Sequence, residues 1–203
     1  MTTVILVRHG ETEWNRVERF RGRADVALNE AGVRQAEATA ARISTLWRPA
    51  AIYSSPLSRA RRTAEAIAAP LSLPVRIHEG LWDVDYGQWQ GLSPDEVNQR
   101  WPEELRTWYQ APQRAAIPGG ESLDQLRARC AGTLAQIVDA HPQDTVVMVG
   151  HTVINRVLLL HVLALGNDRF WHLRQDTCAI NVIEAEGAGF TLVSMNDTCH
   201  LQS

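Results

Sequence analysis

The sequence has little cysteine, which argues against a disulfide-stabilised or zinc-binding protein. Its three cysteines, Cys130, Cys178 and Cys199, form no Cys-x-x-Cys pair and are odd in number. This usage is typical of reduced thiols in a cytosolic protein. The histidines also lack the i, i+4 spacing of a zinc-binding helix. We therefore expect neither a disulfide framework nor a metal.

Long hydrophobic runs and a strong net charge are missing as well. The longest apolar stretch, 157–165, is interrupted by His161 and is too short to span a bilayer. The N-terminal residues show no basic stretch followed by a cleavable apolar one. A net charge of −3 argues against a nucleic-acid partner held by bulk electrostatics. We expect a cytoplasmic protein that binds neither membranes nor nucleic acids.

Lysine is absent, and arginine supplies all 20 basic residues. Several arginines lie beside the motifs described below rather than in a surface tract, so the basicity is local, as expected for a small anionic ligand. No repeat, low-complexity tract or linker interrupts the chain. Residues 1–203 are therefore predicted to form one domain.

Apolar, β-branched runs alternate with amphipathic segments, which is typical of α/β folds. Strands are predicted at 3–7, 50–54, 75–77, 145–149, 179–185 and 190–195, the last two joined by the turn Gly187–Gly189. Helices are predicted to start near residues 29–32 and 58, and to span 93–110 (broken at Pro102), 121–140 and 153–165. Residues 8–29 read as a polar loop with a short helix.

Two histidines directly follow predicted strands. The run TVILV leads into Arg8-His9-Gly10, and TVVMV leads into Gly150-His151-Thr152. Ligands of open α/β sheets bind beyond the carboxyl ends of the strands, so both imidazoles can meet over one substrate. A third apolar run ends just before Arg59. Two histidines and at least two arginines predict a cationic pocket for a phosphate.

Five segments together resemble the histidine phosphatase superfamily, in the branch that includes the cofactor-dependent phosphoglycerate mutases. They are Leu6–Asn15 with its RHG motif, SSPLSRARRTA, DYGQWQG, GGES and GHT, and they extend over essentially the whole chain. The resemblance implies a three-layer α/β sandwich, with a mostly parallel central sheet and helices on both faces. It also implies a metal-independent phosphomonoesterase that works through phosphohistidine without a cofactor.

The resemblance assigns the central roles. His9 is expected to be the nucleophile, because attack by a neutral imidazole nitrogen splits a difficult hydrolysis into two displacements. Arg8 and Arg59 are expected to hold the phosphoryl oxygens with their forked donors. His151 is expected to donate to the phosphoryl group as charge grows there.

The acid departs from the family's pattern. Relatives usually carry glutamate in the segment that reads Leu81–Gly91 here, and Asp83, one methylene shorter, occupies that position. We predict Asp83 as general acid and base, with Glu11 as a less favoured substitute. The predicted substrate-binding residues are Gly10, Glu11, Thr12, Asn15, Arg21, Gly22, Tyr86, Thr152 and His200.

Two further segments bear on the substrate. Mutases of this branch carry a long basic insertion where residues 92–120 are short here and hold only Arg100, Arg106 and Arg114. This favours hydrolysis over mutase chemistry. The C-terminal Thr198-Cys199-His200-Leu201 resembles bacterial metal-independent phosphoserine phosphatases, in which it folds toward the active site. The resemblance implies L-phosphoserine as substrate, with His200 at its carboxylate, and makes a homodimer an option.

Three alternatives remain open. An α-ribazole phosphatase or a broad-specificity phosphatase would prefer other small monoesters. A phosphoglycerate mutase would interconvert phosphoglycerates when supplied with bisphosphoglycerate. A catalytically silent protein, weakened by the shorter acid at Asp83, would bind phosphorylated ligands without turnover.

Overall fold

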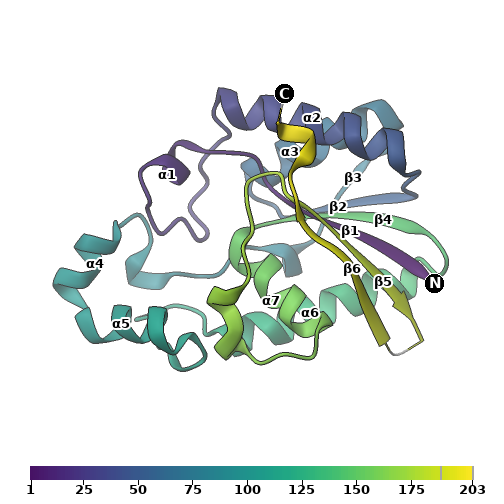
Figure 1. The fold of residues 1–203 in the computed structure, drawn as a ribbon. Coiled ribbons are helices and arrows are strands. Elements are labelled where there is room, and N and C mark those ends of the chain that lie inside the picture. The colour runs from purple at the N-terminus through teal and green to yellow at the C-terminus, as the bar shows by residue number, and fades with distance from the viewer. Residues whose placement is uncertain (188, 203) are drawn as a thin grey trace.

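A mixed six-stranded sheet lies at the centre of the computed structural model, which describes residues 1–187 and 189–202 (Figure 1). The strands are β1 (Thr2–Arg8), β2 (Ala51–Ser54), β3 (Val75–Ile77), β4 (Thr145–Gly150), β5 (Ile180–Glu186) and β6 (Gly189–Asp197). Their order is β3-β2-β4-β1-β5-β6. The first four in this order are parallel, and β5 runs antiparallel to both β1 and β6.

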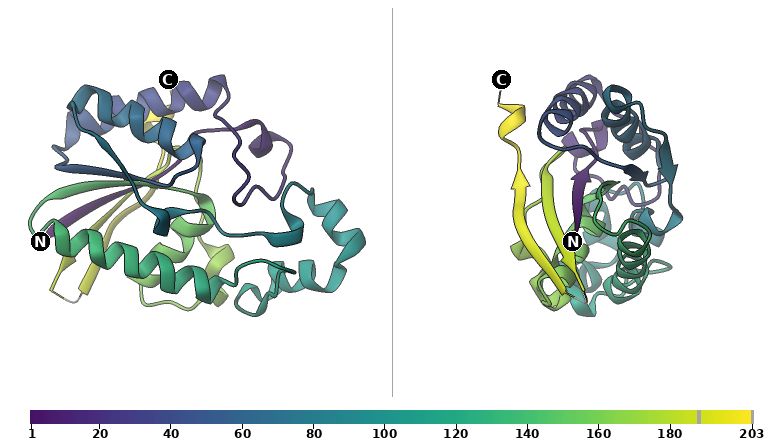
Figure 2. Two further views of the ribbon diagram at one scale, coloured as in Figure 1. Left: turned by 180° about the vertical axis from the view of Figure 1, so that it is seen from behind. Right: turned by 90° about the vertical axis from the view of Figure 1, so that its right-hand side faces the viewer.

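Helices cover both faces of the sheet, which confirms the predicted three-layer architecture (Figure 2). On one face Ile5 and Val7 of β1 pack in a cluster with residues of α2 (Glu30–Leu46) and α3 (Ser58–Ala68). On the other face Val4 and Leu6 pack with residues of α6 (Leu123–Ala140) and α7 (Thr152–Val162). Successive side chains of a strand point to opposite faces. The continuous apolar runs of β1 and β4 follow from burial on both sides.

Three smaller helices lie beyond the carboxyl ends of the parallel strands (Figure 1). They are α1 (Glu13–Arg16), α4 (Pro94–Arg100) and α5 (Pro102–Gln110). Pro102 separates α4 from α5, as predicted. Short 3-10 helices are η1 (Ala69–Leu71), η2 (Glu79–Leu81), η3 (Gly87–Trp89), η4 (Pro112–Arg114), η5 (Asn167–His172) and η6 (Cys199–Leu201).

Two predicted helix boundaries are wrong by a few residues. The helix expected from 121 begins at Leu123, because Ser122 is its N-cap and accepts a hydrogen bond from the Gln125 amide at 3.2 Å. The helix expected to reach 165 ends at Val162. The predicted turn between the last strands includes Ala188, which lies outside the described residues. No described helix is long and apolar enough to cross a membrane.

The loop after β1 lies directly against the start of α2. A side chain at Gly32 would overlap the Glu11 backbone, and one at Gly10 would overlap the Gly32 carbonyl. Asn29 secures the same junction: its Oδ1 accepts from the Gly32 amide at 2.8 Å and its Nδ2 donates to Glu11 Oε1 at 2.7 Å. Backbone contact between loop and helix therefore requires glycine.

This junction predicts opposite outcomes for two glycine-to-alanine changes. Gly32→Ala should lower the free energy of unfolding by about 1–3 kcal/mol, because the new methyl group has no room. Gly132→Ala, on an exposed part of α6 with open space around it, should raise it by about 0.5–1 kcal/mol. Urea unfolding followed by circular dichroism measures both. A Gly32→Ala protein as stable as the parent would contradict the close approach.

Candidate functional site

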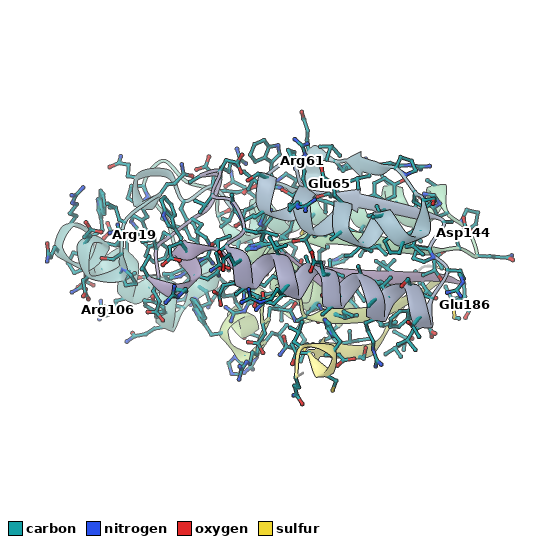
Figure 3. All side chains as sticks on the ribbon, turned by 90° about the horizontal axis from the view of Figure 1, so that it is seen from above. Arg19, Arg61, Glu65, Arg106, Asp144 and Glu186 are labelled. Carbon is teal, nitrogen blue, oxygen red and sulfur yellow. The ribbon has the colours of Figure 1, made fainter. Side chains whose placement is uncertain are left out.

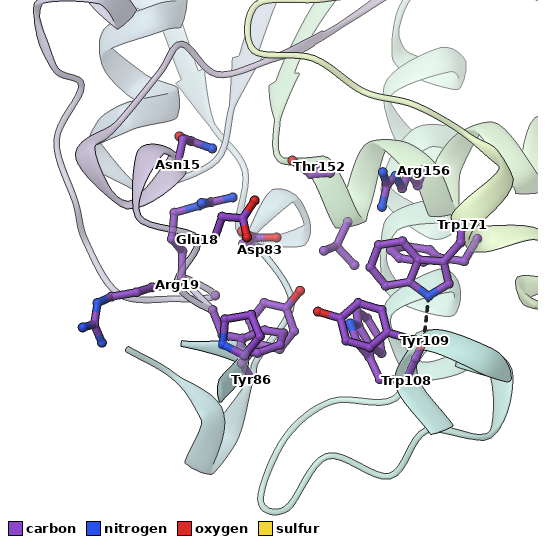
Figure 4. Close-up of a pocket in the computed structure, with 16 residues that line it drawn as sticks. Asn15, Glu18, Arg19, Asp83, Tyr86, Trp108, Tyr109, Thr152, Arg156 and Trp171 are labelled. Atoms are coloured by element: carbon purple, nitrogen blue, oxygen red, sulfur yellow. Dashed lines mark hydrogen bonds between the residues drawn. The ribbon is translucent and has the colours of Figure 1, made fainter. Parts of the chain in front are cut away.

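A cavity of about 320 Å³ opens beyond the carboxyl ends of the strands (Figure 4). Six of the residues predicted from the sequence line it: Asn15, Arg21, Gly22, Asp83, Tyr86 and Thr152. They come from the loop after β1, the segment before η3 and the start of α7. The sheet thus brings together residues that lie far apart in the sequence.

The two histidines lie side by side and do not line this cavity, but Asp83, which does, is 3.7 Å from His151. Strands β1 and β4 pair in register, Arg8 opposite Gly150, so His9 and His151 leave the sheet at the same level. The His9 amide donates to the Gly150 carbonyl at 3.0 Å, and the ring centroids of the histidines are 5.2 Å apart. Both side chains are buried. Strand pairing thus places the two imidazoles in contact.

Hydrogen bonding fixes the tautomer of His9. Its Nδ1 lies 2.6 Å from the carbonyl oxygen of Gly10. A carbonyl can only accept, so Nδ1 carries the proton and Nε2 keeps its lone pair. Burial and the neighbouring Arg59 lower the pKa of His9 well below its ordinary value. His9 is therefore neutral and nucleophilic at neutral pH.

His151 has a different set of neighbours. Its Nε2 lies 2.8 Å from Ser55 Oγ, and its Nδ1 lies 3.7 Å from Asp83 Oδ2. Burial, and after it the charge of Arg59, lower the pKa of His151 well below its ordinary value. A short movement of Asp83 or an incoming phosphoryl group can engage Nδ1, which has no hydrogen-bond partner among the described residues.

The two predicted phosphate-binding arginines are buried with donors to spare. Arg59 donates to the carbonyls of Gly22 and Ala24, both at 2.8 Å, and to Asp83 Oδ2 at 3.2 Å. Arg8 donates to the Gln175 carbonyl at 2.6 Å. Among the described residues the Nε of each has no partner. Burial lowers the pKa of Arg8 to about 9, so it stays protonated at neutral pH.

Asp83 is a buried carboxyl whose position is set by the backbone around it. Its Oδ1 accepts from the Val84 amide at 2.9 Å. Burial raises the pKa of Asp83 above its ordinary value, although Arg59 opposes this shift. Arg129 of α6 supports the same segment by donating to the carbonyls of Gly80 and Trp82 at 2.9 and 2.8 Å. The site thus holds a carboxyl that can carry a proton beside two histidines.

Two predicted substrate-binding side chains lie elsewhere. The Glu11 carboxylate accepts from Asn29 and stands at the α2 junction, not among the residues that line the cavity. His200 lies on η6 with its Nε2 3.0 Å from Thr39 Oγ1 of α2. The C-terminal segment thus packs against α2. Neither Glu11 nor His200 lines the cavity in this geometry, and their contact with the substrate stays a prediction.

The other two predicted residues shape the backbone around the cavity. The Gly10 amide donates to Thr63 Oγ1 at 3.1 Å, and the buried Thr12 donates through Oγ1 to Asn15 Oδ1 at 2.8 Å.

The C-terminal segment reaches Arg8 and Asn15 from another side of the molecule. Thr198, Leu201 and Gln202 line a second hollow together with Arg8, Asn15, Asp176 and Thr177.

Among the cavity residues that sequence analysis missed are Glu18, Trp108, Tyr109, Arg156, Phe170 and Trp171. Arg156 carried a usable signal, because it follows Thr152 of the GHT motif by four residues and so shares its helix face. The aromatic residues come from α5 and η5 and belong to no motif. Their convergence depends on tertiary packing, such as the 2.7 Å hydrogen bond from Trp171 Nε1 to the Trp108 carbonyl.

Comparisons with known proteins find a family model and relatives that match almost the whole chain. Residues 4–198 match the Histidine phosphatase superfamily (branch 1). Phosphoserine phosphatase 1 of Hydrogenobacter thermophilus is 37% identical over 201 residues, which cover 99% of this chain and 95% of that protein. The metal-independent phosphoserine phosphatase of Arabidopsis thaliana is 34% identical over 205 residues, or 100% of this chain and 84% of that protein.

Solved structures are similar along the whole chain. Bacillus stearothermophilus YhfR superposes with a TM-score of 0.95 at 31% identity, covering 100% of both chains. A mutant phosphoserine phosphatase from Entamoeba histolytica, in complex with phosphoserine, superposes with a TM-score of 0.90 at 28% identity. That match covers 99% of this chain and 100% of the other.

The buried histidines predict a loss of stability in mild acid. Because the pKa of His9 and His151 is lowered by folding, the unfolded chain binds more protons below about pH 6.5, and stability falls as the pH decreases. Each histidine contributes a slope of up to about 1.4 kcal/mol per pH unit. Urea unfolding between pH 7.5 and 5.5 measures this slope, which should shrink in a His9→Gln variant.

The control is His172→Gln, which removes an exposed histidine. It should leave the slope of the parent unchanged. Identical slopes for the parent and His9→Gln would contradict a neutral, buried His9.

Proposed function

Because the chain belongs to branch 1 of the histidine phosphatase superfamily, we propose that it hydrolyses small phosphate monoesters through phosphohistidine, with L-phosphoserine as its preferred substrate. The observation that carries this proposal is the neutral His9, with Nε2 free, beside His151, two arginines and a protonatable Asp83. The two phosphoserine phosphatases similar to this chain support the choice of substrate.

In the first step His9 Nε2 attacks phosphorus and the bond to the leaving oxygen breaks. Nδ1 keeps its proton, which it donates in a hydrogen bond to the Gly10 carbonyl. Because Nε2 carries no proton, its attack needs no base. Asp83, whose pKa is raised by burial, gives its proton to the departing alkoxide. The products are an alcohol and phosphohistidine, with Asp83 left as a carboxylate.

In the second step the Asp83 carboxylate removes a proton from water, and the resulting hydroxide attacks phosphorus. The bond between phosphorus and Nε2 breaks, which returns neutral His9 and protonated Asp83 and releases inorganic phosphate. Arg8 and Arg59 balance the charge of the phosphoryl oxygens in both steps, and the neutral His151 donates a hydrogen bond to them. Burial of these groups strengthens each hydrogen bond. Asn15, Arg21 and Thr152 add donors at the rim of the cavity.

A broad-specificity or α-ribazole phosphatase is the second candidate, and one observation favours it. Aromatic side chains form one wall of the cavity, with the rings of Tyr109 and Trp171 5.3 Å apart. Such a wall accommodates flat leaving groups. Mutase chemistry has less support, since Arg100, Arg106 and Arg114 do not line the cavity.

We further infer that the protein acts in the cytoplasm as a homodimer and that residues 1–203 form one domain. All three cysteines are unpaired thiols, as expected in a reducing compartment. Strand β6 is an edge of the sheet and exposes Val193 and Met195, which suits pairing with a second copy. Trp171 is also partly exposed, but it lines the cavity and is not part of this edge.

A substrate panel tests the function directly. In the presence of EDTA the protein should release phosphate from L-phosphoserine faster than from α-ribazole phosphate, p-nitrophenyl phosphate or 3-phosphoglycerate. His9→Ala should lower turnover at least roughly a thousandfold, because no other group can form the intermediate. Labelled substrate should leave an acid-labile phosphate on the parent protein and none on this variant. Metal-dependent release, or full activity of His9→Ala, would refute the proposal.

Asp83 should be the residue that limits the leaving group. Asp83→Asn should lower kcat by roughly 10²–10⁴-fold for alkyl esters, because an amide cannot supply the proton. The loss should be smaller for p-nitrophenyl phosphate, whose phenolate leaves without protonation. Equal losses for both esters would assign Asp83 a structural role. A wild-type protein that binds phosphate but turns over no ester would favour a silent binding protein, and Asp83→Glu would then be the variant to assay.

A further inference from the structure

One part of the cavity is lined by residues that have no role in the proposed chemistry. We call it the distal chamber and define it by Glu18, Trp108, Tyr109, Arg156 and Trp171. In Figure 4 these side chains surround the space next to Asp83 and Tyr86. The leaving group of a phosphate ester held at His9 would extend into this space. The chamber therefore contacts the part of the substrate that distinguishes one monoester from another.

Arg156 is the most unusual residue of the chamber. Its guanidinium stacks on the rings of Phe170 and Trp171, with its central carbon 5.1 and 5.0 Å from their centroids. Stacking holds the planar fork in place without using its N–H donors. No hydrogen bond or ion pair of Arg156 occurs within residues 1–187 and 189–202, and its buried Nε has no partner there. A held guanidinium with vacant donors is suited to a carboxylate.

The position of Arg156 fits a short substrate. His151 is the N-cap of α7, and Arg156 follows five residues later, about 7.5 Å along a helix with a rise of 1.5 Å per residue. Side chains of a helix lean toward its N-terminus, so the long Arg156 side chain points back toward Thr152. Figure 4 shows the guanidinium directed into the cavity from α7. Helix α7 thus presents both His151, on the side of the phosphate, and the cationic Arg156 to the same small molecule.

Glu18 supplies the opposite charge on the other side of the chamber. Figure 4 shows its carboxylate turned toward Asp83 and the cavity. Glu18 and Tyr109 both line this cavity, and burial, and after it the charge of Glu18, raise the pKa of Tyr109. In the part of the chain that the structure describes, Glu18 forms no ion pair. It is available to a cationic group of a ligand.

We propose that the distal chamber binds the α-amino acid part of a phosphorylated amino acid, with Arg156 holding the carboxylate and Glu18 facing the ammonium group. This inference rests on the proposed function and names the residues that determine its specificity. Arg156 takes the place that sequence analysis gave to His200. The rings of Phe170 and Trp171, on which the guanidinium stacks, keep Arg156 in place for the carboxylate.

Three substrates that differ by one group test the proposal. O-phospho-L-serine has both charged groups, O-phosphoethanolamine lacks the carboxylate, and 3-phosphoglycerate has a hydroxyl in place of the ammonium. Arg156→Gln should lower kcat/KM for phosphoserine and 3-phosphoglycerate by roughly 10- to 100-fold and change that for phosphoethanolamine by less than about twofold. Arg156→Lys should recover part of the loss, since it keeps the charge but not the fork.

Glu18→Gln should show the complementary pattern. It should lower kcat/KM for phosphoserine and phosphoethanolamine about two- to fivefold, the size expected of an exposed ion pair, and spare 3-phosphoglycerate. Arg62→Gln, an exposed arginine of α3, is the matched control and should behave as the parent. Thermal unfolding of each variant separates a loss of recognition from a loss of folding.

Several outcomes would overturn the proposal. An equal loss on all three substrates in Arg156→Gln would make Arg156 a general phosphate or packing residue. A parent protein that hydrolyses phosphoethanolamine as well as phosphoserine would show that the carboxylate is not recognised. Hydrolysis of p-nitrophenyl phosphate with none of the three esters would reject the chamber's specificity while leaving the phosphatase intact.

Binding measured without turnover separates the two proposals. Calorimetric titration of the His9→Ala protein with phosphoserine and phosphoethanolamine should show tighter binding of phosphoserine, and adding Arg156→Gln should abolish this preference. A preference that persists in Arg156→Gln overturns the inference. A preference that disappears supports it even if the parent protein proves to be inactive.

Discussion

The site depends on the pairing of two parallel strands in one register. Because Arg8 of β1 lies opposite Gly150 of β4, the residues that follow, His9 and His151, emerge next to each other at the carboxyl edge of the sheet. A shift of one residue in this pairing would turn the side chains of one strand to the opposite face. The continuous apolar runs of both strands, buried between helical layers, hold the register. Chemistry at the edge is thus set by packing in the core.

Burial concentrates positive charge around neutral rings. Burial, and after it the charge of Arg59, lower the pKa of both histidines, and Arg8 adds to this effect. The arginines retain their charge, whereas the histidines lose theirs. This division makes His9 a nucleophile and leaves the arginines to attract an anion. A doubly negative phosphate relieves the repulsion among the cations, so the empty site favours its ligand before any chemistry begins.

Local patterns predicted the parts of the site that stand on motifs. Strand ends gave His9 and His151, and the helix after Ser58 gave Arg59, because each position follows from a short run of residues. Glu11 and His200 do not line the cavity, because Glu11 binds Asn29 at the N-cap of α2 and His200 lies against Thr39 of α2. Local sequence patterns do not show these contacts. The aromatic wall and Glu18 could not be predicted, because α5, η5 and the loop after α1 meet only in the folded chain. Arg156 could have been predicted, because it follows Thr152 by four residues and therefore lies on the same face of the helix.

The short acid has a consequence for the leaving group. In the proposed mechanism Asp83 is the acid. Aspartate has one torsion fewer than glutamate, and Arg129 binds the carbonyls of Gly80 and Trp82 just before Asp83. The Asp83 carboxyl therefore has fewer accessible positions, and little side-chain entropy is lost when it transfers its proton to the leaving group. The same stiffness limits which substrates can receive the proton. An ester whose bridging oxygen lies about an ångström from the reach of Asp83 finds no donor, and such a misplacement lowers the rate about a hundredfold. Because the Asp83 side chain is short, the rate should depend strongly on where the substrate places its bridging oxygen.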